Sequence, residues 1–204
     1  MKAIRTIAGI TAAGVLALGL LTACTPTAEP TPKPTESSTS SPTPTPTQTA
    51  ATEPASDTDA IAAGYATAQE YFRIWDEIRN EHPEDAALID TIAVDSAAEA
   101  ARRSIASAAE KSIKSKGNVK FTLLEGQSYA APARANGVTE SEFGQPILYG
   151  CLDYSGLTGT DANGQAITPG APVKVEVVAR FVKAESRWIV ISYTQDPGST
   201  ECAK

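Results

Sequence analysis

A Thr- and Pro-rich segment, residues 25–57, most constrains what this chain can fold into. Thr, Pro, Ser, Ala and Glu make up almost all of it, and Thr-Pro pairs recur between Thr31 and Pro46. Proline removes backbone hydrogen-bond donors, and the segment offers no bulky apolar side chain around which a core could form. We therefore expect an extended, disordered tether followed by a folded part of about 147 residues, the size of one domain.

The N-terminus has the layout of an export signal. Lys2 and Arg5 precede an uncharged apolar run at residues 7–21. That run is about fifteen residues long, whereas a membrane-spanning helix needs roughly 20. The run ends at Leu21-Thr22-Ala23-Cys24, a tetrapeptide that resembles the lipobox of bacterial lipoproteins.

This resemblance implies that Cys24 receives a diacylglyceryl group and that the chain is cut before it. Residues 1–23 would then be a signal peptide, residues 24–57 a lipidated tether, and residues 58–204 a domain on the extracytoplasmic face of the cell membrane. Two acyl chains hold a protein stably, so the lipid bilayer is the expected partner. Two alternatives stay open, a secreted protein cut after Ala23 and an uncleaved anchor, and in both of them Cys24 is incidental.

The other two cysteines, Cys151 and Cys202, form an even pair once Cys24 carries lipid. In an oxidising compartment the pair predicts a disulfide, with two free thiols or a metal site as the alternatives. The only histidine, His82, has no Cys or His partner at ligand spacing. We therefore expect neither a metal nor another cofactor.

The charge of the chain argues against nucleic acid as a partner. The formal net charge is −7, and removal of residues 1–23 takes away Lys2 and Arg5 and makes it more negative. An acidic surface repels phosphate backbones and anionic lipid headgroups. Attachment to a membrane must then come from the lipid on Cys24.

Helical periodicity dominates the first half of the folded part. Apolar residues from Ile61 to Trp75 recur every three or four positions, which predicts a helix from residue 57 to about residue 80 with Ser56, Asp57 or Thr58 as its N-cap. Pro83 suits the first turn of a second, shorter helix. An Ala-rich third helix, residues 97–114, is expected to be capped by Asp95 or Ser96 and stopped by Gly117.

In the second half of the folded part, apolar and polar residues alternate as they do in β-strands. Strands are expected at residues 119–123, 147–155, 173–181 and 188–194, and the last two form a hairpin. Residues 161–164 predict a turn, and residues 129–145 predict a long loop because they hold few large apolar groups. The fold class is therefore α+β, with helices packed on one face of a curved antiparallel sheet of four or more strands.

Several short motifs carry a resemblance to a known fold family. They are Tyr71-Phe72 and Trp75-Asp76 in the first helix, Gly117 before the first strand, the strand Cys151-Leu152-Asp153-Tyr154-Ser155, then Asp161 and Gly164, and finally Arg187-Trp188-Ile189-Val190. Residues 57–202 resemble the NTF2-like (cystatin-like cone) superfamily, and more narrowly actinobacterial lipoproteins that place such a domain behind a Thr/Pro-rich stalk. The resemblance implies a pocket inside the cone, for which the candidates are Tyr71, Trp75, Asp153 and Trp188.

Three functions are compatible with a lipid-anchored domain of this predicted fold. The first is a non-catalytic domain that binds another envelope protein, a cell-wall component or a small apolar ligand. The second is a ketosteroid-isomerase or SnoaL-like enzyme with Asp153 as the base, facing Tyr71 or Tyr65. The third is a prophage-type lipoprotein that acts in surface exclusion. We expect no enzyme, because the chain has neither a Gly-x-Ser-x-Gly elbow nor a phosphate-binding glycine loop.

Overall fold

The computed structural model describes residues 50–203. The predicted signal peptide, Cys24 and most of the predicted tether therefore lie outside the described residues. Residues that precede the expected domain boundary at residue 57 already contact the folded domain. The amide of Ala51 donates to the Ser186 carbonyl at 2.6 Å, and Glu53 pairs with Lys183 at 3.0 Å.

Helices α1 (Asp57–Glu81), η1 (Pro83–Thr91) and α2 (Asp95–Glu110) come first along the chain. The Ser56 hydroxyl accepts a hydrogen bond from the Asp59 amide at 3.1 Å, which confirms Ser56 as the N-cap of α1. Pro83 opens η1, a 3-10 helix. Among residues 50–203, no helix has the length and apolar character needed to cross a membrane.

The two ends of α2 differ from the prediction. Val94 occupies its N-cap position without a side-chain hydrogen bond, so neither Asp95 nor Ser96 caps the helix. The helix ends at Glu110, because the chain then turns into a short strand, β1 (Lys114–Lys116), that pairs with β5 (Thr158–Thr160). Gly117 makes the turn after β1 at a φ of +90°, and an added Cβ there would lie 2.1 Å from the Gly156 carbonyl oxygen.

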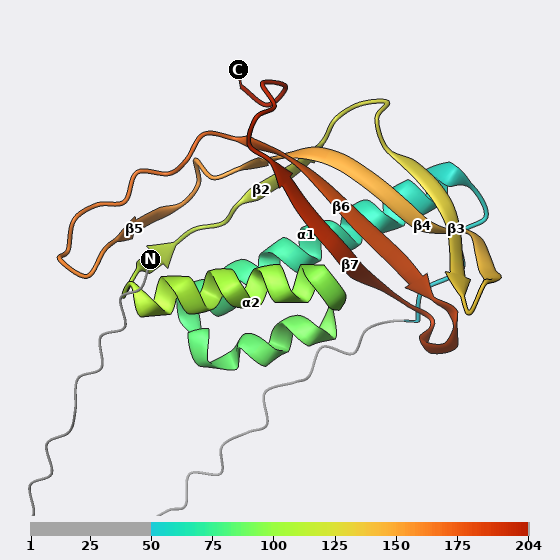
Figure 1. Ribbon diagram of the computed structural model, residues 1–204, viewed down its shortest axis with the longest axis horizontal. Coiled ribbons are helices and arrows are strands. Elements are labelled where there is room, and N and C mark those ends of the chain that lie inside the picture. The colour runs from blue at the N-terminus through green and yellow to red at the C-terminus, as the bar shows by residue number, and fades with distance from the viewer. Residues whose placement is uncertain (1–49, 204) are drawn as a thin grey trace, which may run out of the picture. The chain divides into compact units, whose positions relative to one another are not determined.

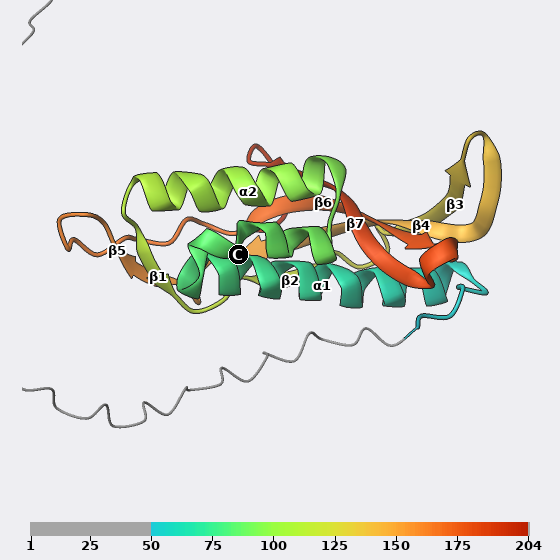
Figure 2. The same ribbon diagram turned by 90° about the horizontal axis from the view of Figure 1, so that it is seen from below.

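The larger sheet is antiparallel, in the order β2 (Lys120–Leu123), β4 (Val138–Asp153), β6 (Val173–Val182) and β7 (Arg187–Asp196), and β3 (Tyr129–Ala135) also pairs with β4. The helices α1, η1 and α2 lie on one side of this sheet (Figures 1 and 2). The short strands β1 and β5 lie at one end of the molecule, and the β3–β4 hairpin lies at the other. The predicted α+β plan is thus confirmed.

The prediction of a long loop at residues 129–145 is wrong. These residues form β3 and the first half of β4, a hairpin that turns at Asn136-Gly137. Both turn residues have positive φ, +50° and +81°, as a tight type I′ hairpin turn requires. By contrast, the predicted turn at residues 161–164 is confirmed, since the Asp161 carboxylate accepts hydrogen bonds from the amides of Asn163 and Gln165.

Two groups of side chains form the core between helices and sheet. The larger contains an aromatic cluster of Tyr71, Phe72, Trp75, Phe121 and Tyr193, whose neighbouring rings lie 5.1 to 6.3 Å apart. Gly150 lets β2 approach β4 here, because an added Cβ would lie 2.4 Å from the Phe121 ring. The second, smaller group is built on Phe181 and Trp188, whose ring centroids lie 5.4 Å apart.

Candidate functional site

The structure does not gather the four predicted pocket residues. Tyr71 and Trp75 pack against each other in the aromatic cluster, with their rings 5.5 Å apart. Trp188 belongs to the other core group, beside Phe181. Asp153 is on the outer face of β4, because strand alternation turns it away from Leu152, whose side chain faces the helices.

Asp153 is therefore not placed to act as a base between the helices and the sheet. Its carboxylate accepts a hydrogen bond from the Ser155 amide at 2.8 Å, and this bond lowers the pKa of Asp153. The two candidate tyrosines are also occupied. Tyr71 donates to the Ala97 carbonyl at 2.8 Å, and Tyr65 donates to the Phe121 carbonyl at 3.1 Å.

A cavity of about 340 Å³ opens beside the aromatic cluster, between the two α-helices and the sheet. Its volume falls within the range of small-molecule pockets. We call it the cone pocket, and its lining is as follows: Phe72, Trp75, Asp76 and Arg79 from α1; Ala100, Arg103 and Ser104 from α2; and Val119, Leu152, Tyr154, Tyr193 and Gln195 from the sheet side. Of the predicted pocket residues, only Trp75 is among them.

Asp76 is the buried charge of the cone pocket. It is 1% exposed, and its two oxygens have separate partners: Oδ1 accepts from Arg79 Nη2, and Oδ2 accepts from the Val119 amide, each at 2.6 Å. Burial raises the pKa of Asp76 to about 6, against the opposing effect of Arg79 and of the Val119 amide. Asp76 thus ties α1 to the start of β2 and orients Arg79 at the pocket.

Two tyrosines and a glutamine form a polar network on the opposite wall. The side-chain amide of Gln195 donates to the Tyr154 hydroxyl at 3.0 Å and also to the Tyr193 hydroxyl. Burial raises the pKa of both tyrosines, and hydrogen bonds from Tyr193 and Gln195 oppose the rise at Tyr154. Both hydroxyls are therefore protonated at neutral pH.

Two buried donors on side chains that line this pocket have no acceptor among the described residues. Trp75 Nε1 and Arg79 Nε are both buried without a partner. The Tyr154 hydroxyl accepts a hydrogen bond from Gln195 and is partly exposed. Buried donors without partners are rare in native proteins, and these two lie on side chains that line one cavity.

A second cavity, of about 330 Å³, adjoins the cone pocket and shares Arg79, Ser104 and Tyr154 with it. Its far side is apolar and includes Ile113, Leu157 and Ile167. A wider groove, of about 1040 Å³, lies between α1 and the β1–β5 ribbon. That groove holds none of the buried side-chain atoms that lack a partner, and we therefore take the cone pocket as the candidate site.

Within residues 50–203, one group of side chains has the composition of a metal site. His82, Glu84 and Asp85 bring a ring nitrogen and two carboxylate oxygens within 4.8 Å of one another. All three are exposed at the junction of α1 and η1, where acidic side chains commonly gather without an ion.

Comparisons with known proteins leave the family open. No protein-family profile matches the chain, and no curated protein sequence does. Among solved structures, the chain is similar to the intermembrane space region of the chloroplast protein ARC6, at 8% identity and a TM-score of 0.42 over 66% of this chain and 95% of that one. It is also similar to a protein from Catenulispora acidiphila, at 17% identity and a TM-score of 0.37 over 70% of this chain and 97% of that one.

Proposed function

We propose that this chain is a cell-envelope lipoprotein, anchored by a diacylated Cys24, that presents a non-catalytic NTF2-like binding domain outside the cytoplasmic membrane. The cone pocket is the binding site of that domain. The observation that carries the proposal is the cavity itself, which has aromatic and aliphatic walls and is lined by the buried carboxylate of Asp76.

Several features support this assignment. Helices on one face of a bent antiparallel sheet, with a cavity between them, match the plan of an NTF2-like cone. A disulfide joins Cys151 to Cys202, as expected for a domain in an oxidising compartment. The lipobox-like tetrapeptide comes first along the chain and the Thr/Pro-rich segment follows it, which is the order that an anchor and a spacer require.

An isomerase-type enzyme is the second candidate, and it would use Asp76 in place of Asp153. The raised pKa of Asp76 favours it, because a general base works best with a pKa near the working pH. Against it, each oxygen of Asp76 already accepts a hydrogen bond, from Arg79 and from the Val119 amide. This arrangement suits a structural clamp at a binding pocket better than a carboxylate free to take a substrate proton.

The anchor is tested by changing Cys24 to serine. We expect Cys24→Ser to leave an uncleaved precursor or to release the protein from the membrane fraction, because serine has no thiol to accept the diacylglyceryl group. Globomycin treatment of wild-type cells should likewise leave a precursor. Cell fractionation with gel migration measures both, and Thr27→Ser, which leaves Cys24 in place, is the control. Unchanged retention and migration in both experiments would show that Cys24 is not lipidated.

A further inference from the structure

The second cavity, which adjoins the cone pocket, is walled largely by segments that lie outside both core groups. We call it the ribbon cavity. Residues 111–118 and 155–172 carry β1, β5 and their connections, and none of them belongs to either core group. We propose that the ribbon cavity and the cone pocket together hold one uncharged, largely apolar molecule that extends from one cavity into the other. This inference rests on the proposed function and names the class of its ligand.

The large aliphatic side chains of these segments gather at the ribbon cavity instead of in the core. They are Ile113 in the turn after α2, Leu157 between β4 and β5, and Ile167 after β5, and all of them line the cavity. Each keeps some contact with solvent, and Ile167 is 36% exposed. Apolar groups that come from separate segments and remain at the surface are typical of a binding site.

Main-chain hydrogen bonds hold this apolar wall in place. The strands β1 and β5 are paired, with Lys114 opposite Thr160. The Ile167 amide donates to the Gly159 carbonyl at 2.9 Å, and Ala166 forms a β-bridge with Thr160. The cavity is thus shaped by the fold itself, which lowers the cost of ordering its walls when a ligand binds.

The charged side chains of both cavities already have partners of opposite sign. Of the described residues that line the ribbon cavity, Arg79 alone is charged, and it is paired with Asp76 at 2.6 Å. In the cone pocket, Arg103 is paired with Glu99 at 3.3 Å. An ionised ligand group would lose its hydration here without gaining a free counter-charge, so an uncharged molecule fits the site better.

The two cavities are close enough for one molecule to occupy both. Arg79, Ser104 and Tyr154 line each of them, and their volumes are about 330 and 340 Å³. The hydroxyls of Ser104 and Tyr154 lie at this junction and can take part in hydrogen bonds with a neutral polar group. A ligand with two apolar halves and one hydroxyl or carbonyl group between them matches this arrangement.

The test compares two probes of similar shape and different charge. Benzhydrol has two phenyl rings on a carbon that bears a hydroxyl, and diphenylacetate has a carboxylate in place of that hydroxyl. Isothermal titration calorimetry is done on residues 24–204 carrying Cys24→Ser, so that no lipid is added and the unit Thr45–Lys204 stays whole. We expect benzhydrol to bind at least about tenfold more tightly than diphenylacetate, because burial of an unpaired carboxylate is unfavourable.

A one-ring probe and two variants locate the ligand. Benzyl alcohol fills only one cavity and should bind at least about tenfold more weakly than benzhydrol. Ile167→Ser removes part of the apolar wall at an exposed position, so the fold is retained, and benzhydrol should bind about tenfold more weakly. Val138→Ser is the matched control, because Val138 is 66% exposed on the β3–β4 hairpin at the other end of the molecule, and it should change neither affinity (Figure 1).

The outcomes separate this inference from the proposed function. Diphenylacetate that binds as tightly as benzhydrol would overturn the inference. Benzhydrol binding that Ile167→Ser does not weaken would also overturn it, and a shift of the Trp75 indole N–H signal by benzhydrol would then keep the cone pocket as the binding site. No binding of either probe would contradict both the inference and the assignment of the cone pocket as a binding site.

Discussion

Replacing Asp76 with alanine should lower the free energy of unfolding by about 3 to 5 kcal/mol, since removing one partner of a buried ion pair leaves the other uncompensated. The side chain of Arg79 is only 13% exposed, and it would lose its anion. The Val119 amide would lose its acceptor at the same time. Chemical denaturation of residues 24–204, followed by circular dichroism, measures the change.

A neighbouring carboxylate on the same helix is the matched control for Asp76. Glu77 pairs with Arg73 at 2.6 Å, but both side chains are about half exposed and Arg73 keeps Glu70 as a second partner. Glu77→Ala should therefore cost no more than about 0.5 kcal/mol. A loss of less than 1 kcal/mol in Asp76→Ala would show that Asp76 does not hold α1 to β2.

Loss of the disulfide is the second large effect. The bridge joins β4 to the C-terminal tail across a sequence separation of 51, with the two Cα atoms 5.6 Å apart. For a loop of this length, the chain-entropy treatment gives a stabilisation of roughly 4 kcal/mol. We expect a loss of about that size in the double variant Cys151→Ala/Cys202→Ala, measured by denaturation under non-reducing conditions.

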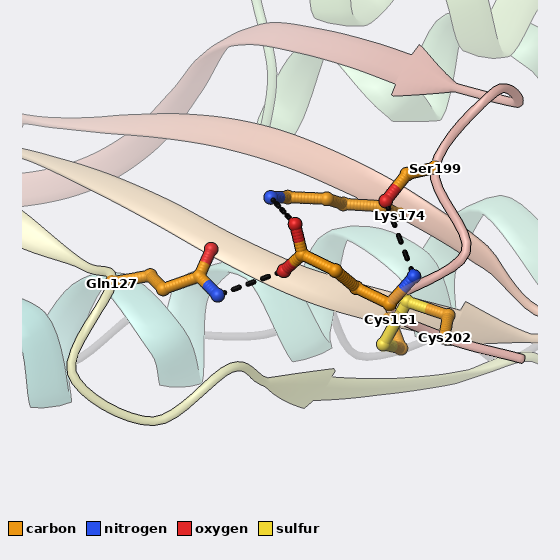
Figure 3. Close-up of a disulfide and its surroundings, with 6 residues drawn as sticks. Gln127, Cys151, Lys174, Ser199 and Cys202 are labelled. Carbon is orange, nitrogen blue, oxygen red and sulfur yellow. Dashed lines mark hydrogen bonds and ion pairs between the residues drawn. A yellow bond between two sulfur atoms is a disulfide. The ribbon is translucent and has the colours of Figure 1, made fainter. Parts of the chain in front are cut away.

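The other contacts of the tail are too weak to replace the bridge. Glu201 pairs with Lys174 and accepts a hydrogen bond from Gln127, each at 2.8 Å, and Figure 3 shows Gln127, Lys174 and Ser199 around the disulfide. Such exposed pairs contribute about 1 kcal/mol or less. Reductant should destabilise the wild-type chain and leave the double variant unchanged. A wild-type stability that does not respond to reduction would contradict the role given to the bridge.

The sequence predicted the parts of the fold that depend on local pattern. The spacing of apolar residues from Ile61 to Trp75 and the cap at Ser56 predicted α1. The alternation of apolar and polar residues predicted β6 and β7. The β3–β4 hairpin was missed because β3 is rich in alanine and the first half of β4 is mostly polar, so neither shows a clear hydrophobic alternation. The dipeptide Asn136-Gly137 was the available signal, since it is the strongest short-range indication of a hairpin.

The site was harder to predict because both faces of β4 are apolar. Leu148 and Leu152 face the helices, but Ile147 and Tyr149 on the outer face look equally suited to a core. Nothing in the strand alone showed that Tyr154 rather than Asp153 lies on the pocket side. The packing of β4 against the helices decides which of its two faces lies on the pocket side, and this packing cannot be read from the strand sequence alone.

Two further site features depend on tertiary structure. The pairing of β6 with β7 shifts register between Val178 and Ala179, so alternation along β7 is broken before Tyr193 and Gln195 reach the pocket wall. In the sequence, Asp76 stands out only as part of the motif Trp75-Asp76. Its spacing of three from Arg79 on α1 is a signal that a search for charged pairs on the apolar face of a helix would have found.

The central claim, that the cone pocket is the binding site of the domain, can be tested with the two tryptophans of the chain. Trp75 lines the pocket, whereas Trp188 lies in the other core group. In a proton–nitrogen correlation spectrum of residues 24–204 carrying Cys24→Ser, each indole N–H gives its own signal. On titration with benzhydrol, we expect the Trp75 signal to shift to saturation while the Trp188 signal stays in place. A Trp75 signal that does not move, or a shift of Trp188 alone, would contradict the account.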